Sequence, residues 1–561
     1  MKVNTPRRIV IVGGVAAGMS TATRLRRRDE AAHIVVLERG NDVSFANCGL
    51  PYYVGGIIID RDDLLLQSPE RLFERFRIDV RVNSEATRID PLNQTVTVSS
   101  AQGSYDLHYD ELVLATGAAA LRPDIPGSER MLTLRSLDDT DALDAALTSA
   151  DLSTGAGAAN RVVIAGAGFI GLELAENLVA RGHAVTLAQR GAHLLALDAE
   201  MAEPVAEHLR AAGIDLRLNS TVAAVNSESV TLDDGSIVEA TLVISAVGVR
   251  PESDLARDAG IELGPGSGIR VDSQFRTSAA HVHAVGDVAE KVSAIDGRDR
   301  LVMLAGPANH AGRLVADALA GDRVASAPAL GTAIIELFGM TVASLGATER
   351  ELRAGGRDIR VIHTHPASHA TYYPGSETMS LKLVVDATTD LILGAQAVGG
   401  SGVDKRIDVL STAMSAGLTA SALADLELAY APQYGSAKDP VNMLGYIARN
   451  LREGLTETVQ WHELDDLLQR GTALVDVRTP AEFEAGSIPG AINIPLEKLR
   501  DRAFEFVSRR VVVTCQVGQR GHTAARLLVN LNIAVANLDG GYSTWLSGTR
   551  ARQPQPIGAA T

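Results

Sequence analysis

Two cysteines are the side chains of this sequence best suited to redox or sulfur chemistry. Cys48 lies in Ser-Phe-Ala-Asn-Cys-Gly-Leu-Pro-Tyr-Tyr (residues 44–53), and Cys515 lies in Cys-Gln-Val-Gly-Gln-Arg (residues 515–520). Each precedes a segment that can begin a helix, where the helix dipole favours the thiolate form. Taken alone, an isolated free cysteine is more often a small buried hydrophobic residue. The neighbouring motifs must therefore decide between the two interpretations.

A glycine-rich turn lies shortly before Cys48. The apolar run 9–12 predicts a buried parallel strand, and we expect a helix from Met19 onward. Glycines in such a turn let the backbone approach a pyrophosphate at the helix amino terminus. Val15 replaces the middle glycine of G-x-G-x-x-G, but Glu38 ends the next strand and can accept hydrogen bonds from ribose hydroxyl groups. These residues predict a first dinucleotide site that includes Gly13, Gly14, Ala17 and Gly18.

A second and complete motif follows the strand 162–165. Its G-x-G-x-x-G sequence leads into an expected helix over 172–181, which is the context that a dinucleotide site requires. The next strand ends at Gln189, where NAD-preferring sites usually carry an acid, and Arg190 could pair with a 2'-phosphate. The sequence is thus compatible with NADPH as well as NADH. Glu173 either faces the nicotinamide side or lies on the helix surface. The motif comprises Gly166, Gly168, Phe169, Ile170 and Gly171.

Composition limits the classes of function. The formal net charge of -16 argues against a nucleic-acid partner, which would need a basic face. Two cysteines in 561 residues rule out a disulfide framework and suit a reducing cytosol. The apolar run near the amino terminus is too short for a signal segment or a membrane span. We therefore expect a cytoplasmic protein of several domains that binds neither nucleic acid nor membrane.

The carboxyl-terminal part changes character after the linker 451–457. Residues 473–483 and 486–495 precede an expected strand over 511–514, which runs into Cys515, and we expect a helix from Thr523. Backbone N–H groups at such a strand-to-helix turn can cradle an outer sulfur atom. Four residues separate Cys515 from Arg520, one fewer than in the related phosphatase loops, so the cradle has the size for sulfur.

The segment around Cys48 resembles coenzyme A-disulfide reductases, a single-cysteine branch of the pyridine nucleotide-disulfide oxidoreductases. Other disulfide reductases carry Cys-x4-Cys here, and this sequence has no second cysteine nearby. The second sulfur must then come from outside the chain. The carboxyl-terminal part, with Cys515 and Arg520, resembles a rhodanese domain.

This resemblance implies an α/β protein with two Rossmann-like dinucleotide-binding domains, an α+β dimerisation domain and a carboxyl-terminal α/β rhodanese domain. The expected boundaries are 1–150 and 246–328 for the FAD-binding domain, 151–245 for the NAD(P)H-binding domain, 329–452 for the dimerisation domain, and 453–561 for the linker and rhodanese domain. The Ala, Asp, Ser and Gly-rich segment 138–160 is expected to be a connection between domains.

The resemblance also implies site residues. For the two dinucleotides it adds Arg39, Ser44, Ala115, Thr116, Gly117, Gly248, Gly286 and Asp287. For coenzyme A it implies Arg24, Arg27, Ser44 and Asn47; a solvated helix face is the alternative for the arginines. Asn47 would position the reacting sulfur. Tyr372 and Tyr430 would reach across a homodimer and stabilise a departing thiolate, although surface tyrosines in Pro-Gly turns are the alternative. We expect no metal site at His363, His365 and His369, because no carboxylate or cysteine completes a ligand set in the sequence pattern.

The function implied is transfer of electrons from NADH or NADPH through FAD to Cys48. Its substrate would be coenzyme A persulfide, coenzyme A disulfide or polysulfide, with Cys515 carrying sulfane sulfur. Three alternatives remain open: plain coenzyme A-disulfide reduction, NADH peroxidase or oxidase chemistry with a sulfenic acid at Cys48, and a non-catalytic sulfur-redox sensor.

Overall fold

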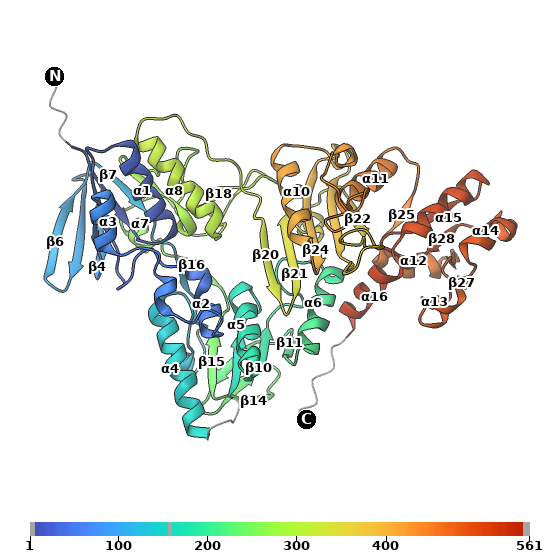
Figure 1. Cartoon of the computed structure of the whole chain (residues 1–561), viewed down its shortest axis with the longest axis horizontal. Helices are drawn as coiled ribbons and strands as arrows, with labels where there is room; N and C mark the ends of the chain where they lie inside the picture. The colour runs from blue at the N-terminus through green and yellow to red at the C-terminus, as the bar shows by residue number, and fades with distance from the viewer. Residues whose placement is uncertain (1–5, 155–159, 554–561) are drawn as a thin grey trace. The chain divides into compact units, whose positions relative to one another are not determined.

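The computed structural model describes residues 6–154 and 160–553, arranged in two compact units (Figure 1). Unit 1 comprises Met1–Ala188 and Ser220–Gly331, and unit 2 comprises Gln189–Asn219 and Thr332–Thr561. Parts of the expected domains fall on 1–5, 155–159 and 554–561, which lie outside the described residues. Among the described residues, no helix has the length and apolar character needed to cross a membrane.

A parallel five-stranded sheet, ordered β17-β7-β1-β2-β3, forms the first half of unit 1. Side chains of β1 alternate between its two faces: Ile9 and Ile11 pack with α1 and α8, while Val10 and Val12 pack toward the antiparallel sheet β4-β5-β6. Helices α1 and α8 lie side by side (Figure 1). The bounds are β1 Arg8–Val12, α1 Ala16–Arg28, β2 His33–Leu37, α3 Pro69–Phe76, β3 Asp79–Arg81, β4 Ser84–Asp90, β5 Thr95–Ser100, β6 Gly103–His108, β7 Glu111–Leu114, β17 Val282–Ala284 and α8 Ala305–Leu319.

The second half of unit 1 is built on β9, with β10 and β15 paired parallel to it on either side. Helix α5 follows β9, as the second glycine motif predicts. Most of the segment 138–160, expected to be a domain connection, is occupied by the long helix α4. The bounds are β8 Ala118–Ala120, α4 Leu137–Thr154, β9 Arg161–Ala165, α5 Phe169–Ala180, β10 Ala184–Gln189, β12 Val222–Val225, β13 Ser229–Leu232, β14 Ile237–Glu239, β15 Leu242–Ser245, β16 Val249–Pro251, α7 Asp254–Asp258, β18 Lys291–Val292 and β19 Asp299–Arg300.

Unit 2 contains an antiparallel sheet, ordered β20-β21-β24-β23-β22, whose one face is covered by α10 and α11. Helix α6, from the segment 189–219, packs against β21 and β24 of this sheet and against α16. Two separate segments of the chain therefore share this unit. The bounds are α6 Ala199–Ala211, β11 Asp215–Leu218, β20 Ala333–Leu337, β21 Met340–Gly346, α9 Glu349–Ala354, β22 Ile359–Thr364, β23 Ser380–Asp386, β24 Ile392–Gly399, α10 Val403–Ser415 and α11 Pro440–Arg452.

The carboxyl-terminal part of unit 2 is a parallel sheet ordered β25-β29-β28-β26-β27. Along β28, Val511 and Val513 enter one hydrophobic cluster while Val512 enters another, so both faces of the sheet are buried. Helix α15 begins at Gln519, four residues before the expected Thr523. The bounds are β25 Thr458–Val459, α12 Leu464–Gln469, β26 Ala473–Asp476, α13 Pro480–Glu484, β27 Ile492–Asn493, α14 Leu496–Arg502, β28 Val511–Thr514, α15 Gln519–Asn530, β29 Val535–Leu538 and α16 Gly541–Arg552.

Candidate active sites

A pocket of about 720 Å³ lies at the carboxyl ends of β1, β2, β7 and β17. It is the position at which parallel α/β sheets usually bind ligands. The structure brings most of the residues expected at the first dinucleotide to its walls, whereas Gly18 and Ser44 do not line it. The expected residues on the walls are Gly13, Gly14, Ala17, Glu38, Arg39, Asn47, Ala115, Thr116, Gly117, Gly286 and Asp287.

Close backbone contacts around this pocket require glycine at two positions of the turn. Gly13 has φ +108°, and a Cβ there would lie 2.1 Å from the carbonyl oxygen of Ala115. Gly18 lets α1 pack closely, since a Cβ on it would lie 1.9 Å from the carbonyl oxygen of Gly13. Ser44 acts through its backbone: its N–H donates to the carbonyl oxygen of Gly14 at 2.8 Å and so ties the Cys48 segment to this turn.

The polar groups of the pocket fit an adenine dinucleotide such as FAD. The Glu38 carboxylate accepts from the N–H of Gly14 at 2.8 Å, which holds it beside the turn where a ribose would lie. Asp287 forms an ion pair with Arg135 at 2.9 Å, and both side chains line the pocket. Sequence reasoning missed Arg135, because no motif surrounds it.

Cys48 lies at the edge of this site, in the 3-10 turn η1 (Asn47–Gly49) that precedes α2 (Leu50–Val54). Its side chain is exposed, and its thiol lies 3.9 Å from the amide oxygen of Asn47. Partial desolvation and the charge of Glu173 raise the pKa of Cys48, against the opposing effect of Arg135. This direction is opposite to the expected thiolate character, because desolvation and the charge of Glu173 outweigh the effect of Arg135.

Glu173 faces the Cys48 helix from the first turns of α5. Its carboxylate accepts from the hydroxyl group of Tyr52 at 3.3 Å. Burial raises the pKa of Glu173 to about 7, although the hydrogen bond from Tyr52 opposes the shift. Glu173 therefore changes charge in the neutral range, and that charge acts on Cys48.

The second glycine motif has the geometry that its sequence predicts. Gly166 has φ +102°, with a Cβ position 2.3 Å from the carbonyl oxygen of Ala246, and a Cβ on Gly171 would lie 2.0 Å from the carbonyl oxygen of Gly166. A Cβ on Gly168, by contrast, would meet open space, and Gly168 is the N-cap of α5. An open glycine at a helix amino terminus fits the approach of a pyrophosphate.

The remaining residues expected at the nicotinamide dinucleotide surround this turn or follow β10. Phe169 and Ile170 form the first turn of α5, and Gly248 (φ +120°) precedes β16. Gln189 ends β10 and donates through its side chain to the carbonyl oxygen of His193. Arg190 is exposed and forms no ion pair with another described residue, so its charge is available to a ligand.

A basic pocket of about 370 Å³ lies between α1 and α8. Arg24 and Arg27 line it from α1, and Asn309, His310 and Arg313 line it from α8. Arg24 is paired with Asp317 at 2.8 Å, but Arg27 and Arg313 form no ion pair with any other described residue. The pocket can therefore accept a phosphate group. Sequence reasoning found only the α1 half, because the contact with α8 joins segments almost three hundred positions apart.

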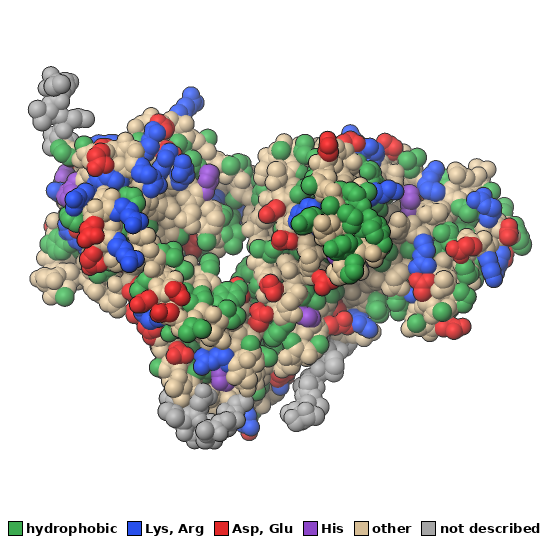
Figure 2. All heavy atoms as spheres, viewed as in Figure 1, with side chains coloured by type: hydrophobic (Ala, Val, Ile, Leu, Met, Phe, Trp, Pro, Cys, Tyr) green, Lys and Arg blue, Asp and Glu red, His purple; other side chains and the backbone are tan. Residues whose placement is uncertain are grey.

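The expected tyrosines lie together in unit 2. The hydroxyl groups of Tyr372 and Tyr430 are 2.8 Å apart, and both side chains are exposed. The N–H of Ala370 donates to the carbonyl oxygens of Gly435 and Pro432, which joins their two loops. Exposed side chains here also include Tyr373 and Tyr434, and Figure 2 shows hydrophobic side chains gathering over the region of α11 and β22.

Cys515 directly follows β28 as the first residue of the loop 515–518, and it is fully buried. Gly518, with φ +86°, is the N-cap of α15, so Arg520 stands in the first turn of this helix. Arg520 makes a two-bond ion pair with Glu482 at 2.6 and 2.9 Å. Glu482, on α13, was not predicted, because no motif in the sequence connects it with Arg520.

The three histidines considered as metal ligands contact protein groups. His363 lies between Asp539 and Glu200, and His365 contacts the hydroxyl groups of Ser380 and Thr544. His369 contacts Ser368 and the carbonyl oxygen of Pro374. Their contacts are thus structural.

Comparison with known proteins agrees with this architecture. Residues 7–312 match the family described as pyridine nucleotide-disulphide oxidoreductase, residues 333–440 match the dimerisation domain of that family, and residues 460–547 match the rhodanese-like domain. The chain belongs to the pyridine nucleotide-disulphide oxidoreductase family and carries a carboxyl-terminal rhodanese domain. It is therefore an α/β oxidoreductase of the class that uses FAD and a nicotinamide nucleotide.

The relatives match different shares of the chain. Coenzyme A disulfide reductases of Staphylococcus aureus are 36% identical over 446 residues, which is 79% of this chain and 100% of theirs. The reduced CoADR-RHD of Bacillus anthracis is 42% identical with a TM-score of 0.94, covering 98% of this chain and 99% of that one. A NAD-dependent persulfide reductase from A. fulgidus is 35% identical with a TM-score of 0.88, covering 96% and 100%.

Proposed function

We propose that this protein uses NADH or NADPH to reduce coenzyme A persulfide, with coenzyme A disulfide and polysulfide as related substrates. The observation that carries the proposal is the position of Cys48, a solitary exposed thiol in a segment whose Asn47 lines the dinucleotide pocket. The likeness to coenzyme A disulfide reductases and to a persulfide reductase supports it.

The first step is attack by the Cys48 thiolate on the carbon-bound sulfur of coenzyme A persulfide. The S–S bond of the substrate breaks, hydrosulfide leaves, and a mixed disulfide between Cys48 and coenzyme A forms. When bound, FAD supplies two electrons that it takes as hydride from the nicotinamide nucleotide. These two electrons and one proton convert the mixed disulfide into the Cys48 thiolate and free coenzyme A thiol. With coenzyme A disulfide, a thiolate leaves in place of hydrosulfide.

The chain's own groups control the charges in this cycle. Arg135 lowers the pKa of Cys48 and Glu173 raises it, so a protonated Glu173 favours the attacking thiolate. The hydrogen bond from Tyr52 fixes the Glu173 carboxylate beside this segment. Asn47 contacts the sulfur directly and would orient it.

Coenzyme A would be held by the basic pocket between α1 and α8. Arg24, Arg27 and Arg313 offer charge for its phosphate groups, against the net negative charge of the chain. This pocket supports contact with a ligand over the alternative of a purely solvated helix face.

The protein would act as a homodimer through residues 329–452, since the dimerisation domain matches the family and carries an apolar surface. In the dimer, Tyr372 and Tyr430 would face Cys48 of the second copy. One tyrosine hydroxyl group would donate a hydrogen bond to the departing thiolate, and the other tyrosine would donate a hydrogen bond to that hydroxyl group. Cys515 would carry a sulfane sulfur as a persulfide and exchange it with coenzyme A thiolate.

The test is stopped-flow oxidation of NADH and NADPH by purified flavin-loaded protein. Coenzyme A persulfide, coenzyme A disulfide, polysulfide and hydrogen peroxide are compared in the wild type, Cys48→Ser and Cys515→Ser. We expect the sulfur substrates to drive turnover in the wild type and Cys48→Ser to abolish it. Turnover with peroxide alone would favour the peroxidase alternative and contradict the proposal.

A further inference from the structure

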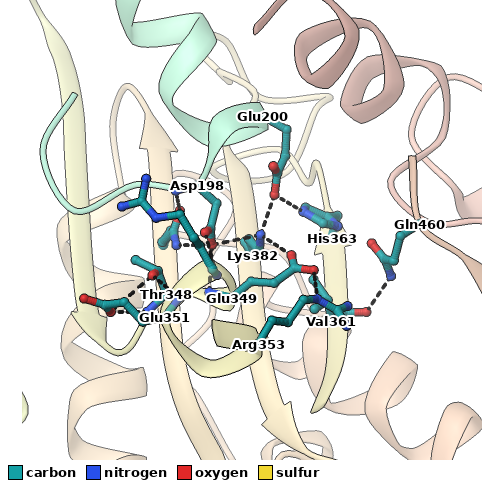
Figure 3. A network of polar contacts seen from close by, with 12 residues as sticks. Asp198, Glu200, Thr348, Glu349, Glu351, Arg353, Val361, His363, Lys382 and Gln460 are labelled. Atoms are coloured by element: carbon teal, nitrogen blue, oxygen red, sulfur yellow. Dashed lines mark hydrogen bonds and ion pairs between the residues drawn. The ribbon is translucent and has the colours of Figure 1, made fainter. Parts of the chain in front are cut away.

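A buried histidine of the dimerisation sheet is in contact with the rhodanese domain. His363 lies on β22, and its Nδ1 is 2.7 Å from the Asp539 carboxylate, at the end of β29. Its Nε2 is 3.0 Å from the Glu200 carboxylate, on α6 (Figure 3). Because both ring nitrogens face acceptors that cannot donate, both must carry a proton, and only the imidazolium form of histidine satisfies that condition.

The Glu200 oxygen that faces His363 also contacts a buried lysine, Lys382. Lys382 is 0% exposed, and its ammonium group lies 2.9 Å from Asp198 and 2.7 Å from Glu349, and also contacts Glu200 (Figure 3). The ammonium therefore occupies the space between three carboxylates that could otherwise hold a cation. Because Lys382 and His363 both contact the same Glu200 oxygen, Oε1, the lysine helps to hold the atom that accepts from His363.

Asp539 begins a strap, residues 539–543, that covers the Cys515 loop. The N–H of Tyr542 donates to the carbonyl oxygen of Cys515 at 2.8 Å, and the N–H of Ser543 donates to that of Gln516 at 3.0 Å. A Cβ on Gly541 would lie 2.4 Å from the carbonyl oxygen of Cys515. Because a peptide group is planar, fixing these two carbonyl oxygens also fixes the N–H groups of Gln516 and Val517.

Further contacts hold the strap to β22. A Cβ on Gly540 would lie 2.8 Å from the Cβ of His363, so the strap touches the histidine through its backbone as well as through Asp539. Gln460 donates both to the Asp539 carboxylate at 3.2 Å and to the carbonyl oxygen of Val361, on the same strand as His363. The side chain of Thr544, just after the strap, contacts His365 at 2.8 Å.

We propose that His363, although it belongs to the dimerisation domain, is a positioning residue for sulfur transfer at Cys515. It holds Asp539 and, through the strap 539–543, the peptide groups that surround the Cys515 sulfur. The sulfur-carrying loop is thus completed by the oxidoreductase part of the chain. This inference rests on the proposed role of Cys515 and adds to it the residue that aligns the loop.

The alignment depends on the charge of His363. Burial by itself lowers the pKa of His363, but the hydrogen bonds and charges of Asp539 and Glu200 outweigh it and raise the pKa to about 9. The charged form is therefore present at neutral pH and is lost as the pH rises through about 9. The charged and titratable groups of this cluster are Asp539, Glu200, Asp198, Lys382, Glu349, Arg353, His365 and His462.

The experiment measures sulfur transfer to cyanide without any nicotinamide nucleotide. In the donor step, the Cys515 thiolate takes the outer sulfur of thiosulfate or of coenzyme A persulfide and releases sulfite or coenzyme A thiolate. In the second step, cyanide removes that sulfur as thiocyanate and restores the thiolate. The full-length wild type is compared with His363→Gln, Asp539→Asn and the exposed control His108→Gln, on β6.

We expect His363→Gln and Asp539→Asn to lower kcat/KM for sulfur transfer about 10–100-fold, the effect of a small misplacement of a reacting group. His108→Gln should leave it unchanged. Reduction of coenzyme A disulfide by NAD(P)H, which does not use Cys515, should stay within about two-fold of wild type in all variants. The double variant should lose little more than either single one, because both act through one contact.

The pH dependence of the wild type gives a second test, which does not require any variant to fold. In the wild type, exchange at the amides of the strap, corrected for intrinsic rates, should increase as the pH passes about 9, and sulfur transfer should fall over the same interval. Unchanged transfer in both variants, or transfer that keeps rising with pH together with a strap that stays protected, would overturn the inference. Absence of any transfer by the wild type would contradict the role of Cys515 itself, and both proposals would fall.

Discussion

The hydroxyl groups of Tyr372 and Tyr430 lie 2.8 Å apart although 58 positions separate them in the chain. Each side chain is exposed, so no hydrophobic core holds the pair together. Their loops are instead joined by backbone hydrogen bonds at Ala370. Two phenols that share a hydrogen bond at the surface can act as a proton donor to a ligand or to a second copy of the chain.

The tyrosine pair should affect turnover but not flavin reduction. The hydrogen bond with Tyr430 raises the pKa of Tyr372, so Tyr372 keeps its proton at neutral pH. Tyr372→Phe and Tyr430→Phe should lower kcat for coenzyme A disulfide about 10²-fold. Stopped-flow reduction of the flavin by NAD(P)H should be unchanged. Tyr434→Phe, an exposed tyrosine of the same loop, is the control, and an equal loss in that variant would contradict the role.

The basic pocket should determine affinity for coenzyme A substrates. Arg27→Ala should raise KM for coenzyme A persulfide about ten-fold and leave KM for inorganic polysulfide unchanged, because only the former carries phosphate groups. Arg75→Ala, an exposed residue of α3, is the control for the loss of one positive charge. If Arg27→Ala affects both substrates equally, the pocket does not bind coenzyme A.

Glu173 should modulate the reactivity of Cys48. Its negative charge raises the pKa of Cys48, so Glu173→Gln should shift the pH dependence of Cys48 alkylation by iodoacetamide to lower pH. Glu70→Gln, at an exposed site on α3, serves as the control. A shift to higher pH, or none, would show that Glu173 does not act on the thiol.

Arg190 should set the preference between the two nicotinamide nucleotides. Arg190→Ala should lower kcat/KM for NADPH about ten-fold relative to NADH, since only NADPH carries the 2'-phosphate. NADH in the same variant is the internal control. An unchanged ratio of the two constants would mean that Arg190 does not contact the nucleotide.

Lys382 should be essential for the stability of unit 2. Lys382→Met leaves Asp198, Glu200 and Glu349 buried without their cation, which should cost about 3–5 kcal/mol. Burial raises the pKa values of Glu200 and Glu349, but their cationic and hydrogen-bonding partners, Lys382 among them, hold both well below the usual range. Their contribution in the wild type is therefore present above the ordinary glutamate pKa and is lost as the pH falls.

Thermal unfolding at several pH values checks this prediction. The apparent Tm of the wild type should fall with acid, whereas Lys382→Met should be less stable at neutral pH and should lose less on acidification. Lys438→Met, at an exposed position, is the control. Similar Tm values for the wild type and Lys382→Met at neutral pH would contradict this account of the cluster.

The sequence predicted the local parts of this molecule well, because they are encoded by neighbouring residues. The two glycine turns have a strand, a tight turn and a helix in a single segment, and the fold and family inferred from them are confirmed. The strand that leads to Cys515 was predicted with its bounds, and its helix was placed four residues too late because Gly518 and Gln519 lack helical periodicity.

Contacts between distant segments were beyond sequence reasoning. The other half of the basic pocket comes from α8, and Arg135 reaches the dinucleotide pocket from a loop with no motif. Lys382 lies in a strand whose other residues are mostly apolar. Its three carboxylate partners come from two other elements. The contact of His363 with Asp539 was not predicted, because Asp539 lies 176 positions further along the chain.

The central claim is that electrons leave the protein through Cys48 as it alternates between a thiolate and a mixed disulfide with coenzyme A. Mass spectrometry of the full-length protein after incubation with coenzyme A disulfide tests this directly. We expect one coenzyme A per chain on the peptide that contains Cys48, removed by one equivalent of NAD(P)H. An adduct absent from Cys48, or one that NAD(P)H does not remove, would contradict it.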